Sequence, residues 1–447
     1  MSDHHIKHLP KDTGRSGWEA ISSRVFAPQK LAGKQTADWL IIGAGFAGLS
    51  AARRLAQLHP GDKIVVLDAC EIATGPAGRN SGFMIDVPHS LSTGEYVGSG
   101  DDATKTEIAR NRQAIAFARS AAEEYGMSAR TFNPAGKINA SASARGIEHN
   151  AHYAQALTKI GEAYQLLDAA AMREITGSAY FHDGLYTPGA VMIQPAQYIR
   201  DLAAGIRHQV ALYEHSPVHA LTREGGAWRA TTPDGSVSAP KVILGVNGHV
   251  QNFGFYRGRL MHIFTYASMT DAFQDRDLPG TGRADWALLP ADPMGATLRK
   301  ITTDNGESRI VIRTRFTYDP SMEVSPARVA KITAEQRHSL DARFPALARL
   351  PFSHSWAGRI CLSLNNVPAF GEVDTHLYSA CCENGLGTVK STLAGVMAAE
   401  LASGERHADL LKFEHQPPPK RLPPDPFAWL GINGVIRWQE YRAGREG

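Results

Sequence analysis

A short apolar stretch runs directly into a glycine-rich turn, and no other feature restricts the possible folds of this chain as strongly. The stretch is Trp39-Leu-Ile-Ile42, and the turn after it is Gly43-Ala-Gly45-Phe46-Ala47-Gly48. Residues 47–58 then carry good helix formers at helical spacing, and residues 63–67 form a second run rich in Ile and Val. A strand, a glycine turn, a helix and a second strand within about 30 residues predict the βαβ unit of a doubly wound sheet.

Each glycine of this G-x-G-x-x-G pattern has its own task in binding a dinucleotide. Gly43 permits the tight turn, Gly45 lets the backbone approach a pyrophosphate, and Gly48 lets helix and strand pack closely. The helix begins near Phe46 and Ala47, so its free N–H groups and partial positive charge are offered to the phosphates. The pattern therefore predicts a bound dinucleotide.

The second strand ends in an acid that extends the motif. Asp68 lies twenty residues after Gly48 and is followed by Ala69. A carboxylate at this distance accepts hydrogen bonds from a ribose diol, and it repels a 2′-phosphate. We therefore expect Asp68 and Ala69 to border the cofactor and NADP to be excluded, whereas the motif by itself leaves FAD and NAD open.

The segment after the second strand favours FAD. Residues 75–82, Gly-Pro-Ala-Gly-Arg79-Asn80-Ser81-Gly82, resemble the GASGRN-G-G stretch of the D-amino-acid-oxidase family of flavoenzymes, which includes glycine oxidase, sarcosine oxidase and gamma-glutamylputrescine oxidase. The resemblance covers about residues 36–412 and is nearest to the gamma-glutamylputrescine oxidase branch. Further matching positions are Val218, in the strand that touches adenine in the family, Asn247 and Gly248 after a returning strand, and the late turn Gly385-Leu386-Gly387-Thr388.

The resemblance implies both a fold and a chemistry. The fold would be α/β, with a Rossmann-like FAD-binding domain of glutathione-reductase type and an α+β substrate domain on a mostly antiparallel sheet. The chemistry would be oxidation of a C–N bond, with hydride passing to flavin N5 and the imine then hydrolysed. The backbone of the late turn contacts the flavin in the family, but Leu386 stands where a histidine is usual.

The mode of flavin attachment is a separate question. Some sarcosine oxidases tether the flavin through a cysteine in the strand before the late turn, and Cys361 lies in roughly that region. A buried cysteine more often behaves as a small apolar side chain. We therefore expect FAD to be bound non-covalently.

The order of the segments predicts a discontinuous layout. Residues 1–36 are polar, broken by Pro and Gly, and are interpreted as an extended N-terminal arm anchored by Trp18. Trp429 and Trp438 lie in a C-terminal tail, where they pack either on the chain's own surface or on a neighbour. The expected division is 1–36 for the arm, 37–95, 192–255 and 354–412 for the FAD-binding domain, 96–191 and 256–353 for the substrate domain, and 413–447 for the tail.

Several polar residues are candidates for contact with the substrate. Arg313 and Arg315 alternate on an expected strand, so both would point the same way and present guanidinium groups to a carboxylate, sulfonate or phosphonate. The alternative is a solvated sheet face. His262 and Tyr266 lie four apart on another expected strand and either line a pocket or are buried in the core. Lys390 follows the late turn, near a lysine that helps to activate oxygen in some relatives, or it is a surface lysine.

Composition restricts the partners. A net charge of +3 over 447 residues gives no reason to expect nucleic acid or an acidic membrane surface. The four cysteines have no C-x-x-C spacing and no companion histidine cluster, so we expect no metal site and reduced thiols in the cytoplasm. No secretory signal is evident, and the apolar runs fall short of the ~20 residues that span a bilayer.

The sequence thus predicts an enzyme that oxidises a small amine or amino acid, with O2 or another molecule as electron acceptor. Three rival functions stay open at this stage. An FAD-dependent hydroxylase or halogenase would share the nucleotide-binding half, although neither of the features usual in those enzymes is found. A non-catalytic FAD-binding protein would hold the cofactor without reducing it, and an NAD-only dehydrogenase would lack the flavin.

Overall fold

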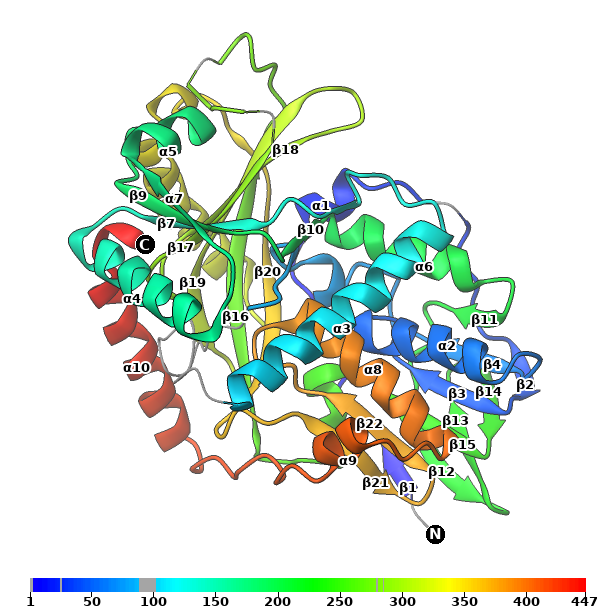
Figure 1. Ribbon diagram of the computed structural model, residues 1–447. Coiled ribbons are helices and arrows are strands. Elements are labelled where there is room, and N and C mark those ends of the chain that lie inside the picture. Colours follow the sequence, from blue (N-terminus) through cyan, green and yellow to red (C-terminus); the bar gives the residue numbers. More distant parts are fainter. Residues whose placement is uncertain (1–2, 25, 88–101, 279, 284) are drawn as a thin grey trace.

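The computed structural model describes residues 3–24, 26–87, 102–278, 280–283 and 285–447. Two large sheets lie side by side in it, one in the lower right and one in the upper left of Figure 1. The first has six strands in the order β11-β4-β3-β15-β22-β21, of which only β21 runs antiparallel to its neighbour. The strands are β3 (Trp39–Ile42), β4 (Ile64–Leu67), β11 (Val210–Tyr213), β15 (Lys241–Leu244), β21 (Ala369–Asp374) and β22 (Leu377–Cys381).

Both faces of the six-stranded sheet are covered, which explains why its strands are continuous apolar runs. On β3, Trp39 and Ile41 pack into one core with the helices, whereas Leu40 and Ile42 pack into a second core beneath a five-stranded sheet. The helices are α2 (Phe46–Leu58), α3 (Asp102–Glu124), α6 (Pro195–Ile206) and α8 (Gly387–Ser403). The five-stranded sheet has the order β1-β12-β13-β14-β2 and consists of β1 (Asp3–His5), β2 (Gly33–Thr36), β12 (Ala220–Glu224), β13 (Ala227–Thr231) and β14 (Gly235–Ala239).

The N-terminal arm is better ordered than the sequence predicts. β1 pairs with β12 and β2 pairs with β14, so the arm supplies both edge strands of the five-stranded sheet. Between them, Trp18 on α1 (Gly17–Ala20) is completely buried. The expected arm is anchored at Trp18, but its two strands were not predicted, because pairing with strands about 200 residues later is not visible in a local pattern.

The second large sheet has eight strands in the order β20-β16-β19-β18-β17-β7-β9-β8. All its pairs are antiparallel except β17 with β7, as the resemblance implies. Around it lie α4 (Ala144–Ile160), α5 (Ala169–Thr176), α7 (Pro326–Arg343) and α10 (Phe427–Ala443). Its strands are β7 (Lys137–Ser141), β8 (Gln165–Asp168), β9 (Asp183–Thr187), β16 (Leu260–Thr270), β17 (Trp286–Pro290), β18 (Thr297–Thr302), β19 (Ser308–Tyr318) and β20 (Phe352–Ser363).

Two segments lie on the other side of the expected boundaries. Residues 354–363 were assigned to the FAD-binding half, but they form most of β20, which pairs along its length with β16. Helix α3 was assigned to the substrate half, yet Ala114, Ile115 and Ala118 pack into the core that α2 and α8 share. A small three-stranded sheet completes the fold, with β5 (Phe83–Met84), β10 (Val191–Ile193) and β6 (Phe132–Asn133), and α9 (Ala408–Glu414) follows α8.

Candidate active site

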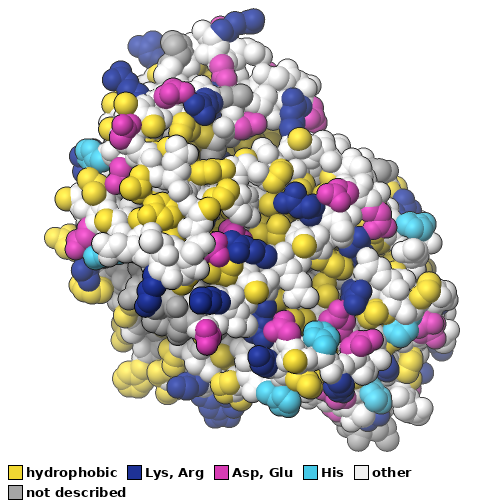
Figure 2. Space-filling model, in the orientation of Figure 1, with side chains coloured by type: hydrophobic (Ala, Val, Ile, Leu, Met, Phe, Trp, Pro, Cys, Tyr) yellow, Lys and Arg dark blue, Asp and Glu magenta, His cyan; other side chains and the backbone are white. Residues whose placement is uncertain are grey.

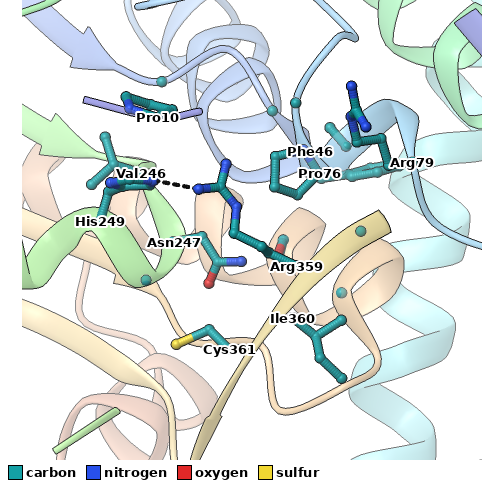
Figure 3. Close-up of a pocket in the computed structure, with 18 of the residues that line it drawn as sticks. Pro10, Phe46, Pro76, Arg79, Val246, Asn247, His249, Arg359, Ile360 and Cys361 are labelled. Carbon is teal, nitrogen blue, oxygen red and sulfur yellow. Dashed lines mark hydrogen bonds between the residues drawn. The ribbon is translucent and has the colours of Figure 1, made fainter. Parts of the chain in front are cut away.

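A long cavity lies between the two large sheets and brings together segments from the whole chain (Figure 3). The glycine turn after β3, the end of β4 and the late turn before α8 all contribute to its wall. All the cofactor residues expected from the sequence except Gly48 line this cavity. They are Gly43, Gly45, Phe46, Ala47, Asp68, Ala69, Arg79, Asn80, Ser81, Gly82, Val218, Asn247, Gly248, Gly385, Leu386, Gly387 and Thr388.

Gly48 is absent from the wall because it has a packing role. A Cβ atom at Gly48 would lie 1.7 Å from the Gly43 carbonyl oxygen, so only glycine lets α2 approach the turn. Gly43 has a φ of +101°, and a Cβ there would lie 2.6 Å from the Gly245 oxygen. At Gly45, by contrast, the nearest atom to an added Cβ is the Ala77 Cβ at 3.6 Å, so this glycine keeps open space rather than a tight contact.

Asp68 is hydrogen-bonded to the backbone of the glycine turn. Its Oδ2 accepts a hydrogen bond from the Ala44 N–H at 2.7 Å, and its Oδ1 accepts one from the Cys70 N–H at 2.9 Å. Burial raises the pKa of this carboxyl above its ordinary value, whereas the two backbone N–H groups oppose the shift. The side chain therefore holds the shape of the turn and also faces the cavity.

The segment 75–82 is held by its own side chains. Asn80 donates to the Ala77 oxygen at 2.7 Å and accepts from the Gly82 N–H at 2.8 Å, which fixes a compact turn. Arg79 points away from this turn. Its guanidinium donates to the carbonyl oxygens of Thr74, Thr13, Gly14 and Ala357, so it ties the N-terminal arm to β20.

Two helices begin at the cavity without a side-chain cap. Helix α2 follows Gly45, and α8 follows Leu386, and neither capping residue accepts a hydrogen bond with its side chain. Thr388, in the first turn of α8, instead donates to the Phe83 oxygen at 2.6 Å, which fixes the late turn against β5. Uncapped N-termini present N–H groups and partial positive charge to an anion. The pair suits FAD, which needs one such site for its diphosphate and one for the charge that develops on its ring.

Glu383 is a buried carboxyl group in the same wall. Its Oε1 accepts from the Asn247 side-chain amide at 3.0 Å and from the Cys361 N–H at 3.3 Å, which joins the returning loop to β20. Its Oε2 is buried and has no hydrogen-bond partner among the described residues. Burial raises the pKa of Glu383 above its ordinary value. A buried oxygen without a partner in a cavity wall is suited to a ligand atom.

A second buried cluster, centred on Arg359 of β20, was not predicted from the sequence. Its Nη2 lies 2.9 Å from Asp12 Oδ2, and its Nη1 lies 2.9 Å from His249 Nε2. Burial and the nearby guanidinium lower the pKa of His249 to about 3, so the ring is neutral and accepts this bond. Figure 3 shows Arg359 between His249 and Pro10 on one side and Phe46 and Pro76 on the other. The arm residues Ile6, His8, Leu9, Pro10 and Asp12 thereby become part of the wall.

The two candidate arginines of β19 lie in different places. Arg313 lines the cavity, donates to Thr297 Oγ1 at 2.6 Å, and lies over the Phe316 ring. Arg315 forms ion pairs with Glu335 at 2.7 Å and Glu440 at 3.1 Å. The expectation that both side chains point the same way is therefore wrong.

Of the remaining substrate candidates, one lies in the cavity wall and two lie elsewhere. His262 lines the cavity, lies 2.6 Å from the Gln251 amide, and has a pKa lowered to about 4 by burial and by Arg359. Tyr266 bonds Thr317 Oγ1 at 2.7 Å and packs with residues of α7. Lys390 forms an ion pair with Glu107 of α3 at 2.7 Å. Tyr266, Arg315 and Lys390 are not among the described residues that line the cavity, so the structure does not bring them to the site.

Cys361 lies in the cavity wall as a neutral thiol. Its pKa is raised well above the ordinary value by a hydrogen bond with Cys382 and by burial. The other cysteines are likewise free. Over the residues that the structure describes, no group of His, Cys, Asp and Glu is arranged to hold a metal ion. None of the helices in those residues combines the length and the apolar composition needed to cross a membrane.

Comparison with known proteins agrees with this geometry. The family model of FAD dependent oxidoreductases, DAO, matches residues 38–401. The gamma-glutamylputrescine oxidoreductase of Escherichia coli is 25% identical over 440 residues, which cover 93% of this chain and 96% of that protein. A probable oxidoreductase OrdL of Rhizobium meliloti is 26% identical over 424 residues, covering 90% and 92%.

Solved structures show the same fold at lower identity. Glycine oxidase from Geobacillus kaustophilus superposes with a TM-score of 0.68 at 17% identity, covering 86% of this chain and 99% of that one. The L-amino acid deaminase of Proteus myxofaciens has a TM-score of 0.68 at 15% identity, covering 91% and 98%. The predicted fold class and family resemblance are thus confirmed.

Proposed function

Because the chain belongs to the DAO family of FAD dependent oxidoreductases, we propose that it oxidises the C–N bond of a small amine or amino acid that carries an acidic group. Family membership shows that the cofactor is FAD, so the reading as an NAD-only dehydrogenase is set aside. Relatives named for a glutamylated amine, for glycine and for L-amino acids support a substrate with a C–N bond. The acidic group is inferred from this chain's own residues.

The observation that carries the proposal is the position of Arg313. It lies over the Phe316 ring in a cavity that is also lined by the apolar residues Ile85, Leu289 and Ile360. Arg313 also donates to Thr297 Oγ1 at 2.6 Å, and these two contacts hold its guanidinium at the cavity wall. A guanidinium in apolar surroundings binds a carboxylate, sulfonate or phosphonate through charge-assisted hydrogen bonds. We therefore assign Arg313 as the anchor for the acidic end of the substrate.

The residues of the wall would do the following work. When bound, FAD supplies the acceptor for the hydride that leaves the carbon beside the nitrogen, and water then hydrolyses the imine to a carbonyl compound and an amine or ammonia. The uncapped start of α2 and Gly45 would hold the diphosphate, and Gly387 and Thr388 would hold the ring. The apolar wall would exclude water from the reacting carbon. His262, which is neutral and hydrogen-bonded to Gln251, would hold Gln251 in position at the cavity wall rather than exchange a proton.

We further propose that the cofactor is held without a covalent bond, since the Cys361 thiol has a strongly raised pKa. The electron acceptor is O2 or another molecule. Lys390, which follows the late turn in α8, is paired with Glu107 and is not among the described residues that line the cavity.

The test is anaerobic mixing of the purified holoprotein with a panel of amines. The panel should pair each acidic amine with its neutral counterpart, for example an amino acid with its amide. Bleaching of the flavin bands at far lower concentrations of the acidic members than of their neutral counterparts is the expected result. Bleaching by neutral members alone would remove the acidic group from the proposal, and bands that no amine bleaches would favour a hydroxylase or a non-catalytic FAD-binding protein.

A further inference from the structure

The C-terminal helix α10 exposes an unusual amount of apolar surface. Of the ten large hydrophobic side chains that are exposed in the described residues, six lie on it. Ala428, Ile436 and Ala443 are buried on its inner face, against β19 and its neighbours. In Figure 2 hydrophobic side chains are visible at the lower left, where Figure 1 places α10. The exposed face is thus additional to the one that attaches the helix to the protein.

The exposed residues form a stripe on the opposite side of the helix from the buried ones. Phe427 is 69% exposed, Leu430 58%, Trp438 56% and Tyr441 85%. With Gly434 between them, the successive intervals are three, four, four and three residues, which is the spacing of one helix face. We call this stripe, Phe427, Leu430, Gly434, Trp438 and Tyr441, the α10 stripe. Its large residues stand at equal distances on either side of Gly434.

No contact within its own chain requires a glycine at position 434, the centre of the stripe. A Cβ at Gly434, or at the neighbouring exposed Gly431, would meet no atom within 4 Å. Glycine is a poor helix former, so two of them in the middle of an exposed helix are unfavourable unless another backbone approaches closely. Their place at the centre of an apolar stripe indicates the contact point of a second helix.

The stripe has the same spacing when it is read in either direction. When a second copy of α10 is laid antiparallel across the first with its Gly434 opposite Gly434, Leu430 meets Trp438 and Phe427 meets Tyr441, twice each. Charge agrees with this arrangement, because Asp425 precedes the helix and Arg442 lies in its last turn, so opposite charges face one another at both ends. A surface that complements itself in this way fits the two-fold axis of a homodimer.

We propose that the α10 stripe is the dimer interface of this protein and that its partner is a second copy of the same chain. The proposal is independent of the substrate, since the stripe lies on the outer side of a helix that contributes no residue to the cavity wall. In this dimer Trp438 packs on a neighbouring chain rather than on its own surface.

The mass of the holoprotein in solution tests this proposal. Sedimentation equilibrium at 1–50 µM, a range chosen as roughly that of ordinary protein dimers, should give twice the chain mass of 48.4 kDa. Trp438→Glu should give the monomer mass, because a charge is placed in the apolar contact, while FAD content stays unchanged. Leu166→Glu is the matched control: Leu166 is 62% exposed on β8, so its replacement should leave the dimer intact.

A cross-link tests the symmetry. In Gly434→Cys the two new thiols would meet on the axis, and mild oxidation should give a disulfide-linked dimer. Val435→Cys, whose 54% exposed side chain points about 100° around the helix from Gly434, should cross-link far less. A monomeric wild type, or a dimer that Trp438→Glu leaves intact, would overturn the proposal. A monomer that sediments with lipid vesicles through Trp438 would assign the stripe to a membrane surface instead.

Discussion

Arg313 and Arg315 are separated by one residue on β19, yet Arg313 faces the cavity and Arg315 faces Glu335 and Glu440 on two helices. The cause is a β-bulge. Thr265 of β16 pairs with Phe316 and Tyr266 pairs with Thr314, so Arg315 is the extra residue and has a φ of +59°. A bulge redirects the side chain that it contains. The bulge thereby gives two neighbouring arginines different roles: Arg313 is the candidate anchor for the substrate, and Arg315 attaches α10 to the sheet.

This separation supplies a matched pair of variants. Arg313→Ala should raise KM for an acidic amine by about 10- to 100-fold, the loss expected for a charge-assisted hydrogen bond, and should leave KM for the neutral amide nearly unchanged. Arg315→Ala should leave both KM values unchanged and lower the melting temperature. Equal effects of Arg313→Ala on the two substrates would remove it from the anchor role.

Gly45 is the glycine whose replacement should separate cofactor binding from folding. An added Cβ meets only Ala77, so Gly45→Val should fold, whereas the branched side chain should fill the space kept for the diphosphate. The expected product is a folded, colourless protein, measured by circular dichroism and by the ratio of flavin to protein absorbance. A yellow Gly45→Val variant with full flavin content would show that the diphosphate lies elsewhere.

Glu383 should make stability depend on pH. Its pKa in the folded protein is raised above the ordinary 4.5, so its contribution to stability is fully present below pH 4.5 and is lost as the pH rises through the folded pKa. Glu383→Gln does not titrate and keeps an oxygen for Asn247. The difference in melting temperature between the variant and the wild type should therefore shift in favour of the variant from pH 5 to pH 8. The exposed Glu405→Gln is the control for loss of one acid, and equal pH profiles for the two variants would contradict the assignment.

Asp12 should contribute far more than its neighbour Lys11. The Asp12–Arg359 pair is buried, and removing one partner of a buried pair costs about 3–5 kcal/mol. The Lys11–Glu323 pair is exposed, and such pairs contribute about 0–1 kcal/mol. Asp12→Ala should lower the melting temperature by several degrees and speed the loss of FAD on dilution, and Lys11→Ala should do neither. Both are read from thermal melts and from flavin fluorescence after dilution.

Cys361 should carry no flavin. Acid precipitation is expected to leave a colourless pellet and a yellow supernatant, and the denatured protein should have the mass of the polypeptide alone. Cys361→Ser should retain its flavin to the same extent as the wild type. A mass increased by that of FAD and lost in Cys361→Ser would overturn the non-covalent assignment.

Local patterns were sufficient to predict the half of the site that local geometry builds. The turn from Gly43 to Ala47 and the late turn from Gly385 to Thr388 both line the cavity, since each is a glycine turn between a strand and a helix and needs no distant partner for its shape. The family and its fold class were predicted from a resemblance carried mainly by residues 75–82 together with these turns, and both are confirmed.

The features that sequence did not reveal depend on partners far along the chain. The bulge at Arg315 is defined only by its pairing with β16, and the place of Lys390 by Glu107 on α3. Arg359 and Asp12 belong to no recognisable sequence motif. They matter because they form a buried ion pair. For the arm, Trp18 was interpreted as an anchor, whereas Ile6, a second apolar residue in the same polar segment, was a signal that was not used.

The docked arm has a consequence for the order in which the protein is assembled. Asp12 and Arg359 are 347 positions apart, so the arm is synthesised long before the strand that holds it. The wall that the arm supplies is therefore completed only when β20, late in the chain, has been made. Arg359 and the carbonyl oxygens bound by Arg79 then attach the arm to β20. A truncated chain that ended before β20 would lack this wall, however well its first glycine turn formed.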